Sequence, residues 1–164
     1  LSAYLVFGGH LIVRLSDLSE KEAKHLLALE CPQFSDSPFA GAPELKGARV
    51  ALITSAGLSR RDDSTFRPGA TDYRVIPGDI ASGDLLMSHV SANYDRTGFV
   101  QDLNVVFPID RLREMENDKA IVSVADYHYS FMGATEPEAL EESARELAGF
   151  LKEDKVNAVF LNPV

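Results

Sequence analysis

Apolar and polar residues follow one another along the chain in blocks that predict strands separated by helices. Residues 48–54 read A-R-V-A-L-I-T, an apolar run of the kind expected of a strand that is buried on both faces. Shorter apolar runs predict further strands at residues 73–76, 85–87, 120–125 and 156–161. The pattern therefore predicts a sheet whose strands are separated by other elements.

Three helices are predicted between these strands. Ser19-Glu-Lys-Glu22 is a capping box, and it predicts a helix that ends near residue 30. A second helix is expected over residues 108–117, and a third follows the capping box Thr135-Glu-Pro-Glu138. Strands alternating with helices indicate an α/β fold: a three-layer sandwich with a mostly parallel sheet, flavodoxin/Rossmann-like.

The length of 164 residues fits one domain. We expect residues 11–164 to form a single α/β domain and leave open whether it is truncated at its C-terminus. Residues 1–10 resemble a tag or linker remnant, and the alternative for residues 4–7 is an edge strand. Residues 33–47 are rich in Pro, Ser, Gly and Ala, which is typical of an extended connector.

Composition narrows the classes of function. A net charge of −9 argues against general binding of nucleic acid or anionic membranes. The apolar runs are far shorter than the roughly 20 residues of a membrane span. A single cysteine excludes an internal disulfide and favours a cytoplasmic location. No His or basic cluster near Cys31 would lower its pKa, so we expect Cys31 to be structural.

Side chains of chemically useful types follow two predicted strands. Residues 88–104 and residues 126–133 are rich in His, Asp, Asn and Tyr. Because the carboxyl ends of parallel strands share one edge, we expect both clusters to meet there with residues 55–57 and 162–163. The candidates for catalysis are His89, His128, Asp95 and Asp102. The candidates for substrate binding are Ser55, Ser88, Asn93, Arg96, Asn104, Tyr129 and Asn162.

Several chemistries fit these residues. A His could carry a proton while an Asp orients it, and Arg96 could hold a substrate carboxylate. Two His and two Asp could bind iron or zinc, but their spacing matches no recognised motif, and we predict no metal. A Ser88, His128 and Asp102 triad lacks the G-x-S-x-G elbow.

A purely structural alternative stays open for each candidate. Asp102 and Asn104 could cap turns. Tyr127, Tyr129 and Phe131 alternate as packed strand residues would.

The two clusters also carry a family resemblance. The strings S-H-V-S-A-N-Y-D-R, D-L-N-V-V-F-P-I-D-R-L-R-E and H-Y-S-F-M-G resemble the B-component family of glycine/sarcosine/betaine reductase and D-proline reductase. The segments E-C-P-x-F, A-L-I-T-S-A-G-L, Y-R-V-I-P and L-N-P-V fit in the same order. The resemblance covers roughly residues 11–164.

The resemblance implies reductive cleavage of a carbon–nitrogen bond in glycine derivatives or D-proline. It implies an attacking cysteine or selenocysteine directly after Pro163-Val164, so that no cofactor belongs to the 164 residues themselves. It also implies a pyruvoyl group on a partner subunit and a thioredoxin-linked electron donor. We expect a small-molecule substrate, other reductase components and a homo-oligomer. The alternatives are a non-catalytic domain that binds amino-acid-like molecules and a metal-dependent hydrolase or lyase.

Overall fold

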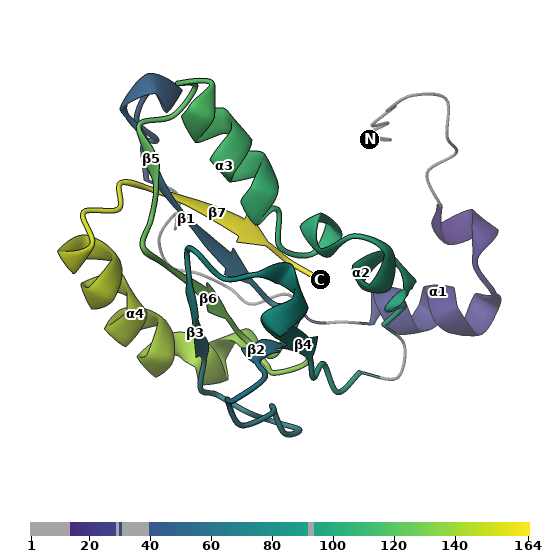
Figure 1. Ribbon diagram of the computed structural model, residues 1–164. Coiled ribbons are helices and arrows are strands. Elements are labelled where there is room, and N and C mark those ends of the chain that lie inside the picture. The colour runs from purple at the N-terminus through teal and green to yellow at the C-terminus, as the bar shows by residue number, and fades with distance from the viewer. Residues whose placement is uncertain (1–13, 29, 31–39, 92–93) are drawn as a thin grey trace. The chain divides into compact units, whose positions relative to one another are not determined.

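The computed structural model describes residues 14–28, 30, 40–91 and 94–164 (Figure 1). The chain divides into two compact units, Leu1–Ser37 and Pro38–Val164. Four expectations lie outside the described residues. These are the tag at residues 1–10, the edge strand at residues 4–7, and the roles of Cys31 and Asn93.

The described part of the first unit contains the helix α1 (Glu20–Leu27). The predicted capping box is confirmed, because the hydroxyl of Ser19 accepts from the backbone N–H of Glu22 and the Glu22 carboxylate accepts from the N–H of Ser19. The helix ends at Leu27, a few residues earlier than predicted.

The second unit is built on β1 (Arg49–Thr54), as the longest apolar run predicts. This strand pairs in parallel with β5 (Ser123–Val124) and β6 (Tyr127–Ser130) on one side and with β7 (Ala158–Asn162) on the other. On the far side of β6, β3 (Arg74–Pro77) runs antiparallel. The sheet is therefore mostly parallel, and it curls as Figure 1 shows.

The strand β4 (Leu85–Met87) forms where the sequence predicts it but belongs to a different sheet. It pairs antiparallel with β2 (Leu58–Arg60), which the pattern did not predict. Strands as short as β2 carry too few alternations to show a period of two. The expectation that residues 85–87 join the parallel sheet is thus wrong.

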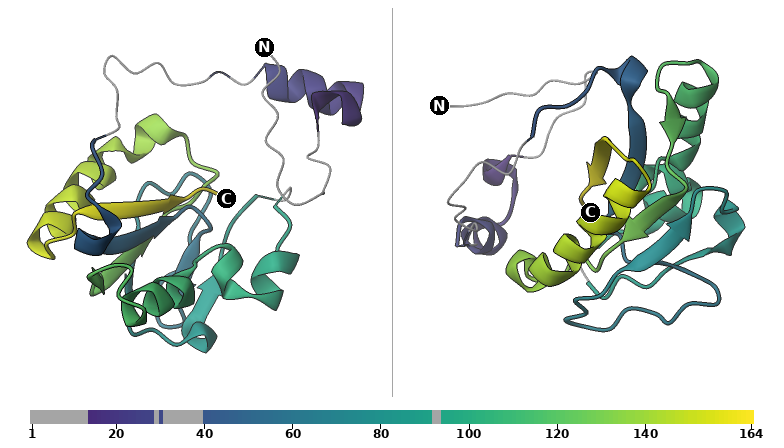
Figure 2. Two further views of the ribbon diagram at one scale, coloured as in Figure 1. Left: turned by 90° about the horizontal axis from the view of Figure 1, so that it is seen from above. Right: turned by 90° about the vertical axis from the view of Figure 1, so that its left-hand side faces the viewer.

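Two helices pack on the two faces of the main sheet (Figures 1 and 2). α3 (Ile109–Asn117) and α4 (Glu141–Glu153) contribute to separate apolar clusters. Neighbouring residues Leu52 and Ile53 of β1 belong to different clusters, because successive side chains of a strand point to opposite faces. The α3 cluster includes Val50, Leu52, Ile76, Phe107 and Leu112, and the α4 cluster includes Ile53, Tyr129, Phe131 and Leu147.

The region predicted as one strand over residues 120–125 followed by a polar loop differs from the prediction. β5 covers only two residues, and the polar-aromatic segment forms β6. Val50 pairs with Val124 and Ile53 pairs with Tyr129, so the chain between β5 and β6 holds more residues than the facing part of β1 and bulges. The second cluster of candidate residues is therefore a strand inside the sheet.

The beginning of α4 also differs from the prediction. A 3-10 turn, Pro137–Leu140, precedes the helix, with its proline in the first position. The Thr135 hydroxyl does not cap this turn and donates a hydrogen bond to the carbonyl of Ala70 at 2.8 Å. The predicted capping box is wrong because the turn begins at Pro137 with Glu136 as its N-cap, and no side chain caps it.

Residues 94–105 hold two elements that the pattern did not predict, α2 (Thr97–Gln101) and a 3-10 turn (Leu103–Val105). None of the helices in the described part of the chain is long and apolar enough to span a membrane.

The strand β7 is unusually exposed for its composition. Its sequence A-V-F-L-N is apolar on both faces, as in a central strand, yet Phe160 is 47% exposed and Leu161 is 64% exposed. Among the described residues β7 pairs only with β1, so its outer edge carries no ladder partner there.

Candidate functional site

The carboxyl ends of β1, β6 and β7 meet at one edge of the sheet, as the sequence predicts. The backbone N–H of Val164 donates to the Ser55 hydroxyl at 2.8 Å. The N–H of Ser55 donates to the carbonyl of Asn162 at 3.2 Å, and the N–H of Gly133 donates to the carbonyl of Ser55 at 2.9 Å. Ser55 thus connects the three strand ends.

Gly133 allows this close approach because it has no side chain. A Cβ atom at this position would lie 2.6 Å from the carbonyl oxygen of Ser55 and 3.0 Å from that of Val164. Both contacts are to backbone atoms that cannot rotate away. A larger residue would therefore push β7 away from the edge.

The end of β4 reaches the same region through Gly57. Gly57 has a φ of 65°, which favours glycine, and its carbonyl accepts from both the N–H and the hydroxyl of Ser88. The N–H of Gly57 donates to the carbonyl of Phe131 after β6. A Cβ on Gly57 would lie 3.0 Å from the Cα of His89. Ser88 and His89 are thereby held beside the ends of β1 and β6.

His89 is buried, with 7% of its surface exposed. Its Nδ1 accepts from the N–H of Ser91 at 3.2 Å, so the neutral ring carries its proton on Nε2. Nε2 has no hydrogen-bond partner in the described part of the chain. Burial and then the charge of Arg96 lower the pKa of His89. The ring is therefore neutral near pH 7, and its Nε2–H is a buried donor.

Arg96 is engaged by its own loop. Its guanidinium donates to the carbonyls of His89 at 2.6 Å, Ser91 at 3.0 Å and Tyr94 at 3.1 Å. It also lies 5.8 Å from the ring centre of Tyr94. The predicted contact of Arg96 with a substrate carboxylate stays a prediction, and in this structure the guanidinium holds the loop.

His128 lies in β6 and is completely buried, so its predicted place in a loop is wrong. Its Nδ1 accepts from the N–H of Leu52 at 2.9 Å, which satisfies the backbone group that faces the bulge. Its Nε2 has no partner among the described residues. Burial and then the charge of Arg113 lower its pKa to about 4. His128 is neutral at pH 7, and its predicted catalytic role remains untested.

The two candidate aspartates bind backbone groups. Asp95 accepts from the N–H of Thr97 at 2.9 Å, and Asp102 accepts from the N–H and the side-chain amide of Asn104 at 2.9 Å each. These hydrogen bonds lower the pKa of both carboxyls. The structural alternative is confirmed for Asp102, which caps the turn Leu103–Val105, whereas Asn104 lies in that turn and accepts from the N–H of Asp110 in α3.

Tyr129 packs inside the sheet and Asn162 lies at its edge. The Tyr129 ring meets Tyr73 edge to face, with ring centres 5.8 Å apart, which confirms the predicted alternative of strand packing. Burial and then the charge of Asp154 raise the pKa of Tyr129. The Asn162 amide donates to the carbonyl of Val105 at 3.4 Å.

The metal-dependent alternative gains no support. In the described ranges, no group of three or more His, Cys, Asp and Glu side chains is placed to hold a metal ion.

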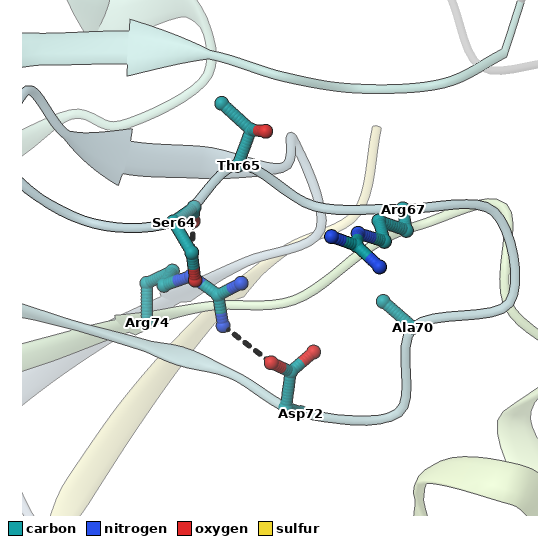
Figure 3. A pocket seen from close by; sticks show the side chains of 6 residues that line it. All are labelled: Ser64, Thr65, Arg67, Ala70, Asp72 and Arg74. Atoms are coloured by element: carbon teal, nitrogen blue, oxygen red, sulfur yellow. Dashed lines mark hydrogen bonds and ion pairs between the residues drawn. The ribbon is translucent and has the colours of Figure 1, made fainter.

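A cavity of about 450 Å³ lies where β3 begins, beside the carboxyl end of β6, because Arg74 pairs with Ser130 (Figure 3). Most residues that line the cavity belong to the loop of residues 61–72, for which the sequence pattern predicted no role. The available signal was the density of Arg and Asp in R-R-D-D-S-T-F-R-P-G-A-T-D-Y-R. The lining residues are Ser64, Thr65, Arg67, Ala70, Asp72 and Arg74.

Comparison with known proteins identifies relatives among amino-acid reductases. The chain is 38% identical over 121 residues to the D-proline reductase subunit gamma of Acetoanaerobium sticklandii, which covers 72% of this chain and 49% of the relative. It is 34% identical over 125 residues to the glycine reductase complex component B subunit gamma of Symbiobacterium thermophilum, which covers 72% of this chain and 29% of the relative. It is 32% identical over 130 residues to the sarcosine reductase complex component B subunit beta of Peptoclostridium acidaminophilum, which covers 76% of this chain and 30% of the relative.

The chain thus matches about half or less of the length of these relatives. No solved structure matches it. The family model of glycine/sarcosine/betaine reductase selenoprotein B matches residues 16–163, which is nearly the whole chain. The chain belongs to the glycine/sarcosine/betaine reductase selenoprotein B family.

Proposed function

We propose that this chain forms the substrate-side wall of an amino-acid reductase that cleaves a carbon–nitrogen bond in a glycine derivative or D-proline. The observation that carries the proposal is the position of Val164. Its N–H is bound by Ser55, and its carbonyl lies against Gly133, at the edge where the ends of β1, β6 and β7 meet. The printed names of the relatives supply the class of reaction.

The family resemblance implies that a cysteine or selenocysteine follows Pro163-Val164. Such a residue leaves the sheet at this edge, beside Ser55 and near the buried ends of β4 and β6. In the reaction a bond forms between the sulfur or selenium and the carbon that bears nitrogen. The carbon–nitrogen bond breaks, and the amine leaves with the bonding pair and takes a proton. Two electrons from the dithiol of a thioredoxin-linked partner then cleave the new carbon–sulfur or carbon–selenium bond, the carbon takes a proton and leaves as the reduced product, and the dithiol becomes a disulfide. This step regenerates the nucleophile.

The residues of this chain bind and orient in this proposal. The Nε2–H of His89 is a buried donor without a described partner, and it would donate to an oxygen of the substrate once the segment that covers it opens. Ser55 and Ser88 fix the strand ends. His128, Asp95 and Asp102 act by positioning the backbone around them. A pyruvoyl group on a partner subunit would offer an electrophilic carbonyl to the substrate amine.

Three further properties belong to the same proposal. The mostly parallel sheet with helices packed on two faces supports a three-layer sandwich of flavodoxin/Rossmann-like type. The names of the relatives support assembly with other reductase components. The single cysteine supports a cytoplasmic location, and a homo-oligomer would cover the exposed strand β7.

The test uses the full-length native protein together with its partner components. With a dithiol donor, release of ammonia or a methylated amine is measured from glycine, sarcosine and betaine, and ring opening to a primary amine is measured for D-proline. The residue after Val164 is identified by alkylation and mass spectrometry. We expect cleavage of one substrate and alkylation at that residue. A relative's B component with the same partners is the positive control.

The proposal fails if that control cleaves its substrate while the native protein cleaves none of the four. Ligand binding without turnover would then support the alternative of a non-catalytic domain that binds amino-acid-like molecules. The cavity beside β3 is the observation that favours this alternative.

A further inference from the structure

The loop of residues 61–72 is held at several points although it contains no helix or strand. The Thr135 and Ser143 hydroxyls donate to the carbonyls of Ala70 at 2.8 Å and Thr71 at 2.6 Å. In its middle, the N–H of Phe66 donates to the Ser88 hydroxyl at 3.1 Å. The loop is therefore anchored to the residue after β4, to the segment after β6 and to α4. A loop pinned in this way keeps its side chains in place, as a binding site requires.

Arg74 fixes the floor of the cavity. Its guanidinium donates to the carbonyl of Ser64 at 2.8 Å and to the Asp72 carboxylate at 2.7 Å, and it lies 4.2 Å from the ring centre of Phe66. Only 10% of its side chain is exposed. All three contacts are with residues of the loop, so Arg74, the first residue of β3, holds the loop in its conformation.

Arg67 stands at the first position of a tight turn. Pro68 and Gly69 follow it, Gly69 has a φ of 72°, and the N–H of Ala70 donates to the carbonyl of Arg67 at 3.1 Å. This is the signature of a type II turn, in which proline and glycine take the two central positions. The turn fixes the backbone from which the Arg67 side chain extends.

The Arg67 guanidinium has no hydrogen-bond or ion-pair partner in the described part of the chain, and Figure 3 shows it extending over the cavity. Asp72 faces the same space, and its second carboxylate oxygen makes no hydrogen bond to a described residue. Two guanidiniums and one carboxylate line the cavity, so one positive charge is left uncompensated in a chain whose net charge is −9. This site attracts an anion against the overall charge of the protein.

We propose that the cavity between Arg67 and Asp72 binds a small amino-acid zwitterion, with its carboxylate on the Arg67 guanidinium and its ammonium group beside Asp72. Arg67 offers the planar pair of donors that matches a carboxylate. Ser64 and Thr65 line the same space with hydroxyls. The choice of an amino acid as the ligand rests on the proposed function, and the pairing of a free cation with a half-free carboxylate supports it.

Other places in the described chain fit this ligand less well. Arg96 already donates to three carbonyls of its own loop. A hollow of about 570 Å³ beside Pro77 lies at the opposite edge of the sheet, and its Arg113 donates to Asp110 and to the carbonyls of Gly78 and Ile80. Neither place leaves a guanidinium open to a carboxylate.

Direct binding tests the proposal without turnover. Calorimetry on the full-length protein compares glycine, sarcosine, betaine and D-proline with acetate, methylammonium and inorganic phosphate. The variants are R67A, R67K and D72N. The control is R145A, which removes an exposed charge from α4 that is paired with Glu141. Thermal unfolding of each variant establishes that it is folded.

We expect at least one amino acid to bind with an affinity at least tenfold above that of acetate and of methylammonium. R67A should lower this affinity by at least tenfold, R67K by less because the ammonium cannot bind in bidentate fashion, and R145A by less than twofold. D72N should weaken the amino acid and leave acetate unchanged. If D72N does not fold, the R67A and R67K results still decide the question.

The proposal is overturned if no amino acid binds, if R67A binds as well as the unsubstituted protein, or if acetate or phosphate binds as tightly as the amino acid. Its failure is separable from that of the proposed function. If R67A cleaves the substrate as well as the unsubstituted protein, the proposed binding site is wrong and the proposed reductase function stands. If the unsubstituted protein binds the amino acid but does not cleave it, and R67A no longer binds it, the binding site stands and the reductase function is wrong.

Discussion

Two polar loops at the same edge of the sheet use similar residues in opposite ways. In the segment that holds His89 and Arg96, the Arg96 guanidinium binds carbonyls of its own segment and the His89 Nδ1 accepts from Ser91. The Asp95 carboxylate accepts from the N–H of Thr97 at the start of α2. At the loop of residues 61–72, the Arg74 guanidinium binds groups of the loop, whereas the Arg67 guanidinium has no partner in the described part of the chain.

The difference shows that residue type alone does not identify a binding group. A guanidinium that satisfies three carbonyls has little capacity left for a ligand, while one that extends from a braced turn keeps its donors free. His128 belongs with the first group, because its acceptor nitrogen serves the backbone of β1. The comparison therefore separates groups that hold the fold from groups that are free to bind.

The largest expected effect is at His128. His128→Ala should lower the free energy of unfolding by about 4 kcal/mol, because it leaves a cavity and a buried N–H of Leu52 without an acceptor. Urea unfolding followed by circular dichroism measures this change. His128→Asn keeps an acceptor near the position of Nδ1 and should cost less than half as much. Equal losses in both variants would contradict the role given to this hydrogen bond.

The protonation of His128 should also make the folding stability depend on pH. The unfolded chain binds a proton on this imidazole near pH 6.5, whereas the native chain binds it only near its pKa of about 4. Acid therefore favours unfolding, and the contribution present above pH 6.5 is lost as the pH falls to 4. Folding stability should drop by roughly 3 kcal/mol over this window. His128→Asn should remove most of this slope, and an unchanged slope would place its origin elsewhere.

Arg96 should matter for stability at an intermediate level. Arg96→Ala leaves the carbonyls of His89, Ser91 and Tyr94 without this donor and should lower the free energy of unfolding by about 2 kcal/mol. Hydrogen exchange at residues 88–96 should increase at the same time. A neutral effect on both measurements would mean that the loop does not depend on its arginine, and the comparison between the two loops would fail.

The smallest expected effect on stability is at Arg67. Arg67→Ala should change the free energy of unfolding by less than about 0.5 kcal/mol, because the side chain has no partner in the described chain to lose. The same urea series measures it beside Arg96→Ala. A loss as large as that of Arg96→Ala would show that Arg67 holds the fold, and the contrast would disappear.

The sequence predicts the parts of the fold that depend on local pattern. The apolar run of β1, the α3 helix and the meeting of strand ends at one edge all follow from periodicity and topology. It does not predict β6, because His128 and Ser130 read as polar although both are buried. Their partners are the backbone N–H groups of Leu52 and Leu58, more than 70 positions away in the sequence. No local pattern contains those contacts.

The candidate site shows the same limit. The prediction of a site at the carboxyl edge rests on topology, and the cavity lies beside that edge. The choice of Arg96 over Arg67 rested on residue type within a dense cluster. Which guanidinium is free depends on how many carbonyls its own loop turns toward it, and this follows only from the folded backbone.

The strand β7 has a consequence for the behaviour of the chain at high concentration. Its outer edge has no ladder partner among the described residues, and with the exposed Phe160 and Leu161 it forms a template on which another extended segment can add. Self-association of the isolated 164-residue chain should therefore begin at this strand, before global unfolding. Leu161→Lys should raise the concentration at which light scattering detects assemblies, while Val122→Lys, at an exposed residue outside β7, should not.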